Sequence, residues 1–133
     1  MADLHAQGFD HAWPETDFIA HLNNKLDIAL GSFEGDHLCG FILIRAQDDQ
    51  GEILTIVVEA GQQGAGLGEK LLRAGESAAK TNGVEIIFLD VAKDNQAALA
   101  LYKNAGYQIC GQRPGYYRRK RGRVDALLFQ KHI

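Results

Sequence analysis

The chain has 133 residues, with 14 Lys and Arg, 17 Asp and Glu, a formal net charge of −3 and 46% hydrophobic residues. This composition is typical of a folded globular protein, and it excludes a disordered chain or one that coats nucleic acid with its whole surface. A chain of this length buries roughly two-thirds of the surface that it exposes when unfolded, so its core needs no disulfide or metal. The sequence predicts one domain over residues 1–133.

The N-terminus, the apolar segments and the cysteines indicate the cellular compartment of the protein. The N-terminus has neither the basic nor the apolar region of a secretory signal, and the apolar runs at 41–44 and 53–58 are far shorter than the ~18 residues of a membrane span. We therefore expect a cytoplasmic protein without membrane contact. Cys39 and Cys110 lie in apolar segments without Cys-x-x-Cys spacing, and the histidines show no metal-ligand spacing. We expect buried, reduced thiols and no metal.

The first half of the chain predicts one helix and three strands. A proline before an apolar periodic run predicts a short helix over about 14–24. Two strand-like runs, 27–34 and 37–47, are separated by Glu-Gly-Asp, which resembles a hairpin turn. After a second turn at 48–51, the run 52–58 is apolar on both faces, as is typical of a central strand.

The second half begins with four glycines between residues 61 and 68, followed by a helical pattern that ends near residue 82. A buried strand over 84–91, a helix over 95–105 and a strand pair over 107–111 and 124–130 complete the chain. The order α-β-β-β-α-β-α-β-β predicts an α/β fold of the α+β type, with a mixed central sheet flanked by helices.

The glycine loop is the first candidate binding site. It stands between a strand and the start of a helix, where unpaired amides and the helix dipole attract an anion such as phosphate. The alternative is a tight turn that binds nothing. A Walker A loop is excluded because Gly68 is followed by Glu69-Lys70-Leu71, without the required Ser or Thr. A dinucleotide-binding loop is excluded because Gly-x-Gly-x-Gly has the wrong spacing and follows the third strand.

A larger set of motifs is similar to those of one family. The pattern Gln/Arg-x-x-Gly-x-Gly/Ala is met by Gln63, Gly66 and Gly68, and a second block is met by Leu89-Asp90-Val91, Asp94 to Ala98 and Leu101 to Tyr107. On these motifs nearly the whole chain resembles the GNAT superfamily of N-acetyltransferases. Trp13-Pro14 and Gly115-Tyr116-Tyr117 are similar to the RimI branch, whose members acetylate the N-terminal amine of a ribosomal protein.

The resemblance implies acetyl-CoA as a substrate, a GNAT-like sheet in which two central strands splay apart around the pantetheine arm, and no metal. It assigns cofactor contacts to Ile56, Val57, Val58, Gln63, Gly64, Ala65, Gly66, Leu67, Gly68, Asn95 and Tyr102. A backbone N–H of Val57 or Val58 would stabilise the negative charge that grows on the acetyl oxygen. Asn95 is also a preferred helix N-cap, and the two roles are compatible.

The resemblance makes Tyr102 the acid that protonates the departing thiolate, although helix spacing alone favours a core tyrosine. Asp90 stands where RimI-like proteins carry a glutamate base, and its side chain is one methylene shorter. Glu52, on the neighbouring strand, is therefore the rival base. The structural alternative for both carboxylates is a helix cap, an ion pair or contact with solvent.

Acceptor binding is assigned by the same resemblance to Trp13, Tyr116 and Tyr117. Residues 113–123 contain six Lys and Arg and no Asp or Glu. The rest of the chain therefore has a formal net charge of −9. This segment predicts either a solvated hairpin turn or a dock for ribosomal RNA or an acidic peptide, and nucleic-acid contact is expected only through Arg118–Arg123.

Three functions stay open, all of which use an acyl-CoA. The first is acetylation of a protein N-terminus; the second is acetylation of a small amine, such as a polyamine or antibiotic, or of lysine; the third is a non-catalytic, regulatory acyl-CoA-binding module. The resemblance implies a first strand before the first helix, and we expect this chain to lack it. We therefore expect the strand 27–34 at a bare sheet edge, which predicts a homodimer.

Overall fold

The computed structural model describes residues 1–2, 15–62, 64 and 66–133. Its elements follow the predicted order: α2 (Glu15–Asn23), β1 (Asp27–Glu34), β2 (His37–Gln47), β3 (Gln50–Val58), the 3-10 turn η1 (Ala60–Gln62), α3 (Leu67–Thr81), β4 (Ile86–Ala92), α4 (Gln96–Asn104), β5 (Gln108–Arg119) and β6 (Gly122–His132). Within the described ranges, no helix is long and apolar enough to cross a lipid bilayer.

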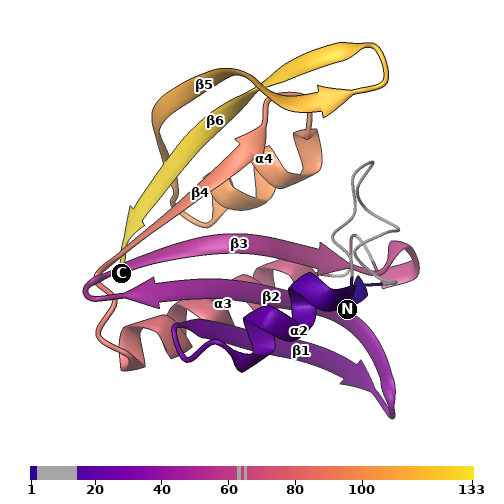
Figure 1. Ribbon diagram of the computed structural model, residues 1–133, viewed down its shortest axis with the longest axis vertical. Helices are drawn as coiled ribbons and strands as arrows, with labels where there is room; N and C mark the ends of the chain where they lie inside the picture. The colour runs from indigo at the N-terminus through magenta and orange to yellow at the C-terminus, as the bar shows by residue number, and fades with distance from the viewer. Residues whose placement is uncertain (3–14, 63, 65) are drawn as a thin grey trace.

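The strands form one mixed sheet in the order β1-β2-β3-β4-β6-β5 (Figure 1). All neighbouring pairs are antiparallel except β3 and β4, which are parallel because α3 crosses between them. In the described sheet β1 lies at an edge, as the sequence predicts. The homodimer inferred from that edge stays a prediction.

The contact between β3 and β4 is short. Only Gln50, Gly51 and Glu52 of β3 are in register with β4, opposite Ile86, Ile87 and Phe88. Beyond these pairs the two strands diverge, and Figure 1 shows β4 rising away from β3. The splay that the resemblance implies is therefore present in the fold.

The main core lies on the face of the sheet that α3 and α4 cover. It contains fully buried residues from several elements: Ile42, Ile44, Leu72, Ile87 and Phe129. Gly75 allows α3 to lie close to β2, because an added Cβ would stand 2.8 Å from Ile44 Cδ1. A smaller cluster on the opposite face contains Phe41, Leu43 and Val57, against which Met1 and Ala2 pack.

Two expectations need correction. Residues 113–123 are not mainly a solvated turn, because β5 continues to Arg119 and β6 begins at Gly122, so only two residues connect the strands. Cys110 is exposed, whereas Cys39 is buried as expected. The reason is that β5 is an edge strand and shifts register between Ile109 and Gly111, which leaves Cys110 at an irregularity.

Candidate active site

The glycine loop leads directly into α3. Gly66 is the N-cap residue with φ 81°, no side chain caps the helix, and Gly64 has φ 84°. A Cβ built on either glycine meets no atom within 4 Å. The amides of the first turn lack intrahelical partners, and no described side chain caps them, so they are available to a phosphate. Gln63 and Ala65, which belong to the same predicted site, lie outside the described residues.

Polar groups line the splay between β3 and β4. Residues Ile56–Val58 lie beyond Glu52, the last residue of β3 that is in register with β4. Thr55 Oγ1 and Asp90 Oδ1, one on each strand, are buried without a hydrogen bond to any described residue. Buried polar atoms of this kind are rare in native proteins. They fit a ligand that inserts polar groups between the strands, as the pantetheine arm does.

Asn95 caps α4, as predicted. Its side-chain Oδ1 accepts a hydrogen bond from the Ala98 backbone N–H at 3.1 Å. The structural role of Asn95 is therefore confirmed, and its contact with the cofactor stays a prediction.

Tyr102 lies in the core, with 4% of its surface exposed. Its ring packs edge-on against Tyr107, with ring centroids 5.6 Å apart, and lies 6.4 Å from the ring of Phe129. Burial and the neighbouring Tyr117 raise the pKa of Tyr102 above its ordinary value. The hydroxyl keeps its proton at neutral pH, so it is available as a donor.

Asp90 lies on β4 and faces a cation. Its Oδ1 is 3.6 Å from Nε of Arg113, whose guanidinium also lies 5.3 Å from the centre of the Tyr116 ring. The ion pair that the sequence left open for Asp90 is therefore confirmed. Asp90 is linked to the acid candidate through Tyr117, which interacts electrostatically with both Asp90 and Tyr102.

Glu52 and Asp90 line the same pocket, whose volume is about 560 Å³. This pocket lies where the pairing of β3 and β4 ends, and its charged lining comprises Arg45, Asp48, Asp49, Glu52, Asp90 and Arg113. Arg45 is already paired, since it donates to both carboxylate oxygens of Asp27 at 2.9 and 3.2 Å. Glu52 is exposed. No contact joins it to Tyr102 in the described part of the chain, so Glu52 would act only through water.

Tyr116 and Tyr117 are in contact but differ in burial. The rings of Tyr116 and Tyr117 meet edge-on at 5.1 Å; Tyr116 is 49% exposed and Tyr117 is half-buried. Burial and the nearby Asp90 raise the pKa of Tyr117 to about 12. Tyr117 therefore interacts with both catalytic candidates, and Tyr116 is exposed. Trp13, the third predicted acceptor contact, lies outside the described residues.

Asp125 is a site residue that sequence reasoning missed. Its carboxylate accepts hydrogen bonds from the Gly115 backbone N–H at 2.8 Å and from Gln112 Nε2 at 2.7 Å. These bonds lower its pKa and hold the irregular stretch of β5 between Arg113 and Tyr117. The sequence could have indicated this role, because Asp125 is an acidic residue within the otherwise apolar run Val124-Asp125-Ala126-Leu127. Asp125 thus positions the segment that carries Arg113, Tyr116 and Tyr117.

We expect Asp125→Ala to lower the melting temperature at pH 7 by a few degrees, because two donors lose a charged acceptor. The stabilisation is complete above the unfolded-state pKa, near 3.9. It is lost as the pH falls through the lower pKa of the folded state. The difference in melting temperature between the two proteins, measured by calorimetry, should therefore shrink as the pH falls below about 3.9. The matched control is Asp36→Ala in the exposed β1–β2 turn, where no such difference is expected.

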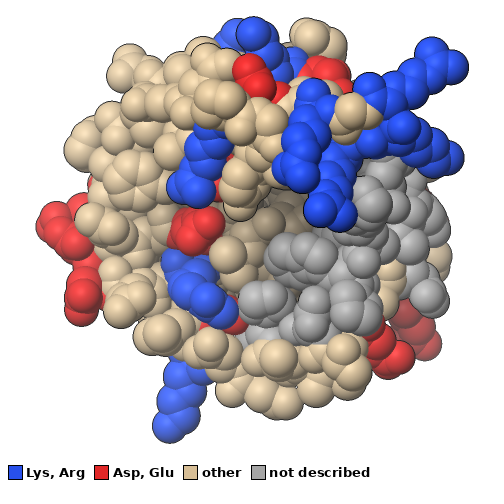
Figure 2. All heavy atoms as spheres, turned by 45° about the horizontal axis from the view of Figure 1, so that its top comes forward, with Lys and Arg blue, Asp and Glu red and all other residues tan. Residues whose placement is uncertain are grey.

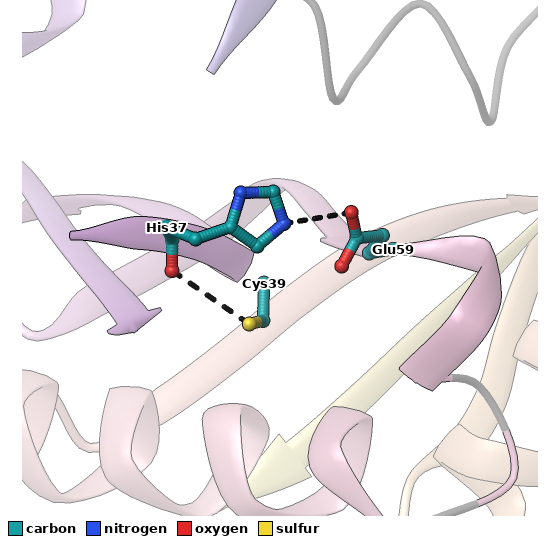
Figure 3. Close-up of side chains that lie close together, drawn as sticks. All are labelled: His37, Cys39 and Glu59. Carbon is teal, nitrogen blue, oxygen red and sulfur yellow. Dashed lines mark hydrogen bonds and ion pairs between the residues drawn. The ribbon is translucent and has the colours of Figure 1, made fainter. Parts of the chain in front are cut away.

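A second polar cluster stands at the ends of β2 and β3 (Figure 3). Possible metal-ligand atoms of His37, Cys39 and Glu59 all lie within 4.8 Å of one another, although the sequence predicts no metal. His37 Nε2 is 2.8 Å from Glu59 Oε1, and the Cys39 thiol lies 3.7 Å from the His37 carbonyl oxygen. Burial and the nearby carboxylates raise the pKa of Cys39. In the described structure these side chains form a hydrogen-bonded network.

The splayed sheet, the glycine loop at a helix start and the buried tyrosine near an aspartate together define an acyltransferase fold. The family model for the acetyltransferase (GNAT) family matches residues 1–107. The chain belongs to this family, and its acyl donor is acetyl-CoA.

Individual relatives agree with this assignment. The chain is 37% identical over 123 residues to the N-alpha-acetyltransferase RimI of Mycobacterium tuberculosis, covering 88% of this chain and 76% of the relative. It is 29% identical over 117 residues to the [ribosomal protein bS18]-alanine N-acetyltransferase of Salmonella typhimurium, covering 87% and 78%. The crystal structure of the ribosomal-protein-S18-alanine N-acetyltransferase of Escherichia coli superposes with a TM-score of 0.92 at 24% identity, covering 99% and 84%. This last likeness shows the fold.

Proposed function

We propose that the protein transfers the acetyl group of acetyl-CoA to the N-terminal α-amine of a protein. The observation that carries the proposal is the grouping of Tyr102, Tyr117 and Asp90 at the splay. The similarity to an N-alpha-acetyltransferase and to bS18-alanine acetyltransferases supports it and makes a ribosomal protein in the cytoplasm the first acceptor to test.

Different groups of the protein carry out the separate tasks of the reaction. Acetyl-CoA supplies an activated acetyl thioester. The amides at the start of α3 bind its phosphates, and a backbone N–H of Val57 or Val58 stabilises the developing negative charge. The Tyr102 hydroxyl donates its proton to the departing sulfur, whose aqueous pKa resembles the 8.5 of a cysteine thiol.

Asp90 is the proposed acceptor of the amine proton. It lines the pocket, and its Oδ1 lies 3.6 Å from Nε of Arg113. The Asp90 side chain is one methylene shorter than that of glutamate, so it reaches less far toward the amine. An α-amine, with a pKa of roughly 7.7 to 8, suits a weak base better than lysine, near 10.4. Glu52, acting through water, is the rival base.

A small amine is the second candidate acceptor. Four carboxylates line the pocket, those of Asp48, Asp49, Glu52 and Asp90, and such a lining attracts polycations. The pocket is open to the same splay, so a polyamine and a peptide N-terminus would compete for it. The acceptor assay must therefore include both.

We expect a peptide with a free N-terminal alanine to be acetylated faster than the same peptide blocked at its N-terminus and carrying lysine. The difference in kcat/KM should be at least about tenfold. Lysine needs about 2.5 pKa units more help from the base, which is roughly 3.4 kcal/mol. Release of CoA measures the rates, with spermidine as a third acceptor.

The assay separates the three functions. A higher kcat/KM for the blocked lysine peptide or for spermidine would contradict the N-terminal proposal and support the alternative acceptor. Acetyl-CoA binding by calorimetry without CoA release from any acceptor would support the non-catalytic module.

A further inference from the structure

The cluster of His37, Cys39 and Glu59 lies outside the pocket of the proposed active site. β2 begins at His37 and β3 ends at Val58, and the Glu59 backbone N–H donates to the Cys39 carbonyl oxygen at 2.8 Å. His37 and Cys39 are two residues apart on one strand, so their side chains lie on the same face of the sheet. Strand pairing thus brings together residues 22 positions apart, which explains why local spacing predicts no metal.

The three side chains offer nitrogen, sulfur and oxygen atoms that lie within 4.8 Å of one another. In Figure 3 the His37 ring and the Glu59 carboxylate point toward each other, with 2.8 Å between Nε2 and Oε1. Around a tetrahedral Zn²⁺ ion, with bonds of about 2.0–2.3 Å, neighbouring donor atoms lie roughly 3.3–3.6 Å apart. The cluster therefore needs shifts of roughly 1 Å to reach this geometry. The His37 side chain is 62% exposed and can rotate to supply them.

The charges around the cluster favour a cation. Glu34 Oε2 lies 4.0 Å from Cys39 Sγ, so a second carboxylate is close to the thiol. Among the described residues, no Lys or Arg forms an ion pair with Glu34 or Glu59. In Figure 2 a group of Lys and Arg side chains gathers on the side of the β5–β6 hairpin, whereas the cluster lies on β2 and after β3. Two carboxylates without a cationic partner attract a divalent ion.

We propose that His37, Cys39 and Glu59 bind one Zn²⁺ ion, with Glu34 or a water molecule as the fourth ligand. Nitrogen, thiolate sulfur and carboxylate oxygen are the donors that zinc takes in proteins, whereas Mg²⁺ and Ca²⁺ take oxygen. The Cys39 sulfur exchanges its proton for the metal, and the proton passes to the solvent. Zinc deprotonates a coordinating thiol even where the surroundings favour the protonated form. The ion also replaces the hydrogen bond between His37 and Glu59.

A hydrogen-bonded network without metal is the alternative. It accounts for His37 and Glu59, whose side chains meet at 2.8 Å. It accounts less well for Cys39, whose thiol makes only long contacts, 3.7 Å to the His37 carbonyl oxygen and 4.0 Å to Glu34. The sulfur nevertheless lies close to both of the other donor groups. A metal ion uses all three side chains.

The bound ion would hold the turn that leads into the glycine loop. Glu59 is followed directly by η1, and the Gln62 backbone N–H donates to the Glu59 carbonyl oxygen at 2.9 Å. The Glu59 backbone N–H is itself bonded to the Cys39 carbonyl oxygen. One ion that binds both Cys39 and Glu59 cross-links the ends of two strands, so opening of these hydrogen bonds becomes less favourable.

Zinc binding is measured on the whole protein after treatment with a chelator. Titration calorimetry with ZnCl₂ should include one site per chain with a Kd in the micromolar range or below. Co²⁺, used as a spectroscopic probe, should give the absorption of a cobalt–thiolate bond. Zinc should raise the melting temperature by several degrees, because it binds the folded state. It should also slow hydrogen exchange at the backbone amides of Glu59 and Gln62.

Variants assign the binding to these residues. His37→Gln, Cys39→Ser and Glu59→Gln should each weaken zinc binding by roughly 10²-fold or more, because even the loss of a residue that only orients a ligand costs roughly 10–100-fold. Cys39→Ser should also abolish the cobalt–thiolate absorption. The matched controls are His132→Gln and Cys110→Ser, which change an exposed histidine and an exposed cysteine and should leave both signals unchanged. Thermal melts without metal establish that each variant folds.

Two results would overturn the zinc site. One is a wild-type protein that binds no zinc, or that binds it no more tightly than the His37→Gln and Glu59→Gln variants do. The other is loss of the signals in either control variant, which would locate the ion elsewhere. Because His37 is exposed, its variant decides the question even if Cys39→Ser does not fold. None of these measurements needs acetyl transfer, so the result is independent of the proposed function.

Discussion

Replacing Tyr102 by phenylalanine should slow the acetyl-transfer step by roughly 10²-fold or more while the protein stays folded. The substitution keeps the ring that packs against Tyr107 and Phe129 and removes only the hydroxyl. Without that donor the thiolate must leave unprotonated or take its proton from water. Single-turnover rates with acetyl-CoA and the alanine peptide measure the effect on the chemical step.

Tyr107→Phe is the matched control. Its hydroxyl donates to Glu76 at 2.9 Å, away from the pocket residues, so its loss should change stability more than rate. A Tyr102→Phe enzyme that turns over as fast as the wild type would remove Tyr102 from the mechanism. Because the pKa of Tyr102 is raised, the single-turnover rate of the wild type should also not fall between pH 8 and pH 10 through loss of this proton.

Replacing Gly66 by valine should weaken acetyl-CoA binding by roughly tenfold or more. Gly66 has φ 81°, a conformation that costs other residues roughly 1–2 kcal/mol, and more for a β-branched one. The loop would relax out of this conformation and turn the first amides of α3 away from the phosphates. Titration calorimetry with acetyl-CoA measures the change in affinity.

Gly83→Val separates a general effect of strain from a loss of the phosphate site. Gly83 has φ 90° and equally open space around an added Cβ, but it lies beyond the other end of α3. Both variants should lose stability by similar amounts, and only Gly66→Val should lose affinity. Equal affinity of a folded Gly66→Val protein and the wild type would contradict the assigned phosphate site.

The elements were predictable because their signals are local. A glycine with positive φ precedes α3, an asparagine caps α4, and short turns separate β1, β2 and β3. Each of these boundaries is therefore determined by a few neighbouring residues. The glycine loop could be placed for the same reason. Periodicity could also place Tyr102 on a buried helix face, but only the resemblance separated a catalytic tyrosine from a core tyrosine.

The remaining features depend on contacts that are distant in sequence. The ion pair between Asp90 and Arg113 joins two strands that are not neighbours in the sheet, and the bond from Gly115 to Asp125 crosses a hairpin at an irregular register. No periodic pattern encodes such a register shift. The exposure of Cys110 escaped prediction for the same reason, because its segment has an ordinary strand pattern.

Because the contact between β3 and β4 is short, bound acetyl-CoA would also stabilise the fold by holding the two halves of the sheet together. Three strands lie on each side of that contact, and only the shared core and a few backbone pairs join the two halves. A pantetheine arm bound between them would add hydrogen bonds that link the two halves. A ligand present at 100 times its dissociation constant adds about 2.7 kcal/mol to the stability of the protein that binds it. The lifetime of this protein in the cell would then follow the supply of acetyl groups, and starvation for acetyl-CoA would deplete the catalyst along with its substrate.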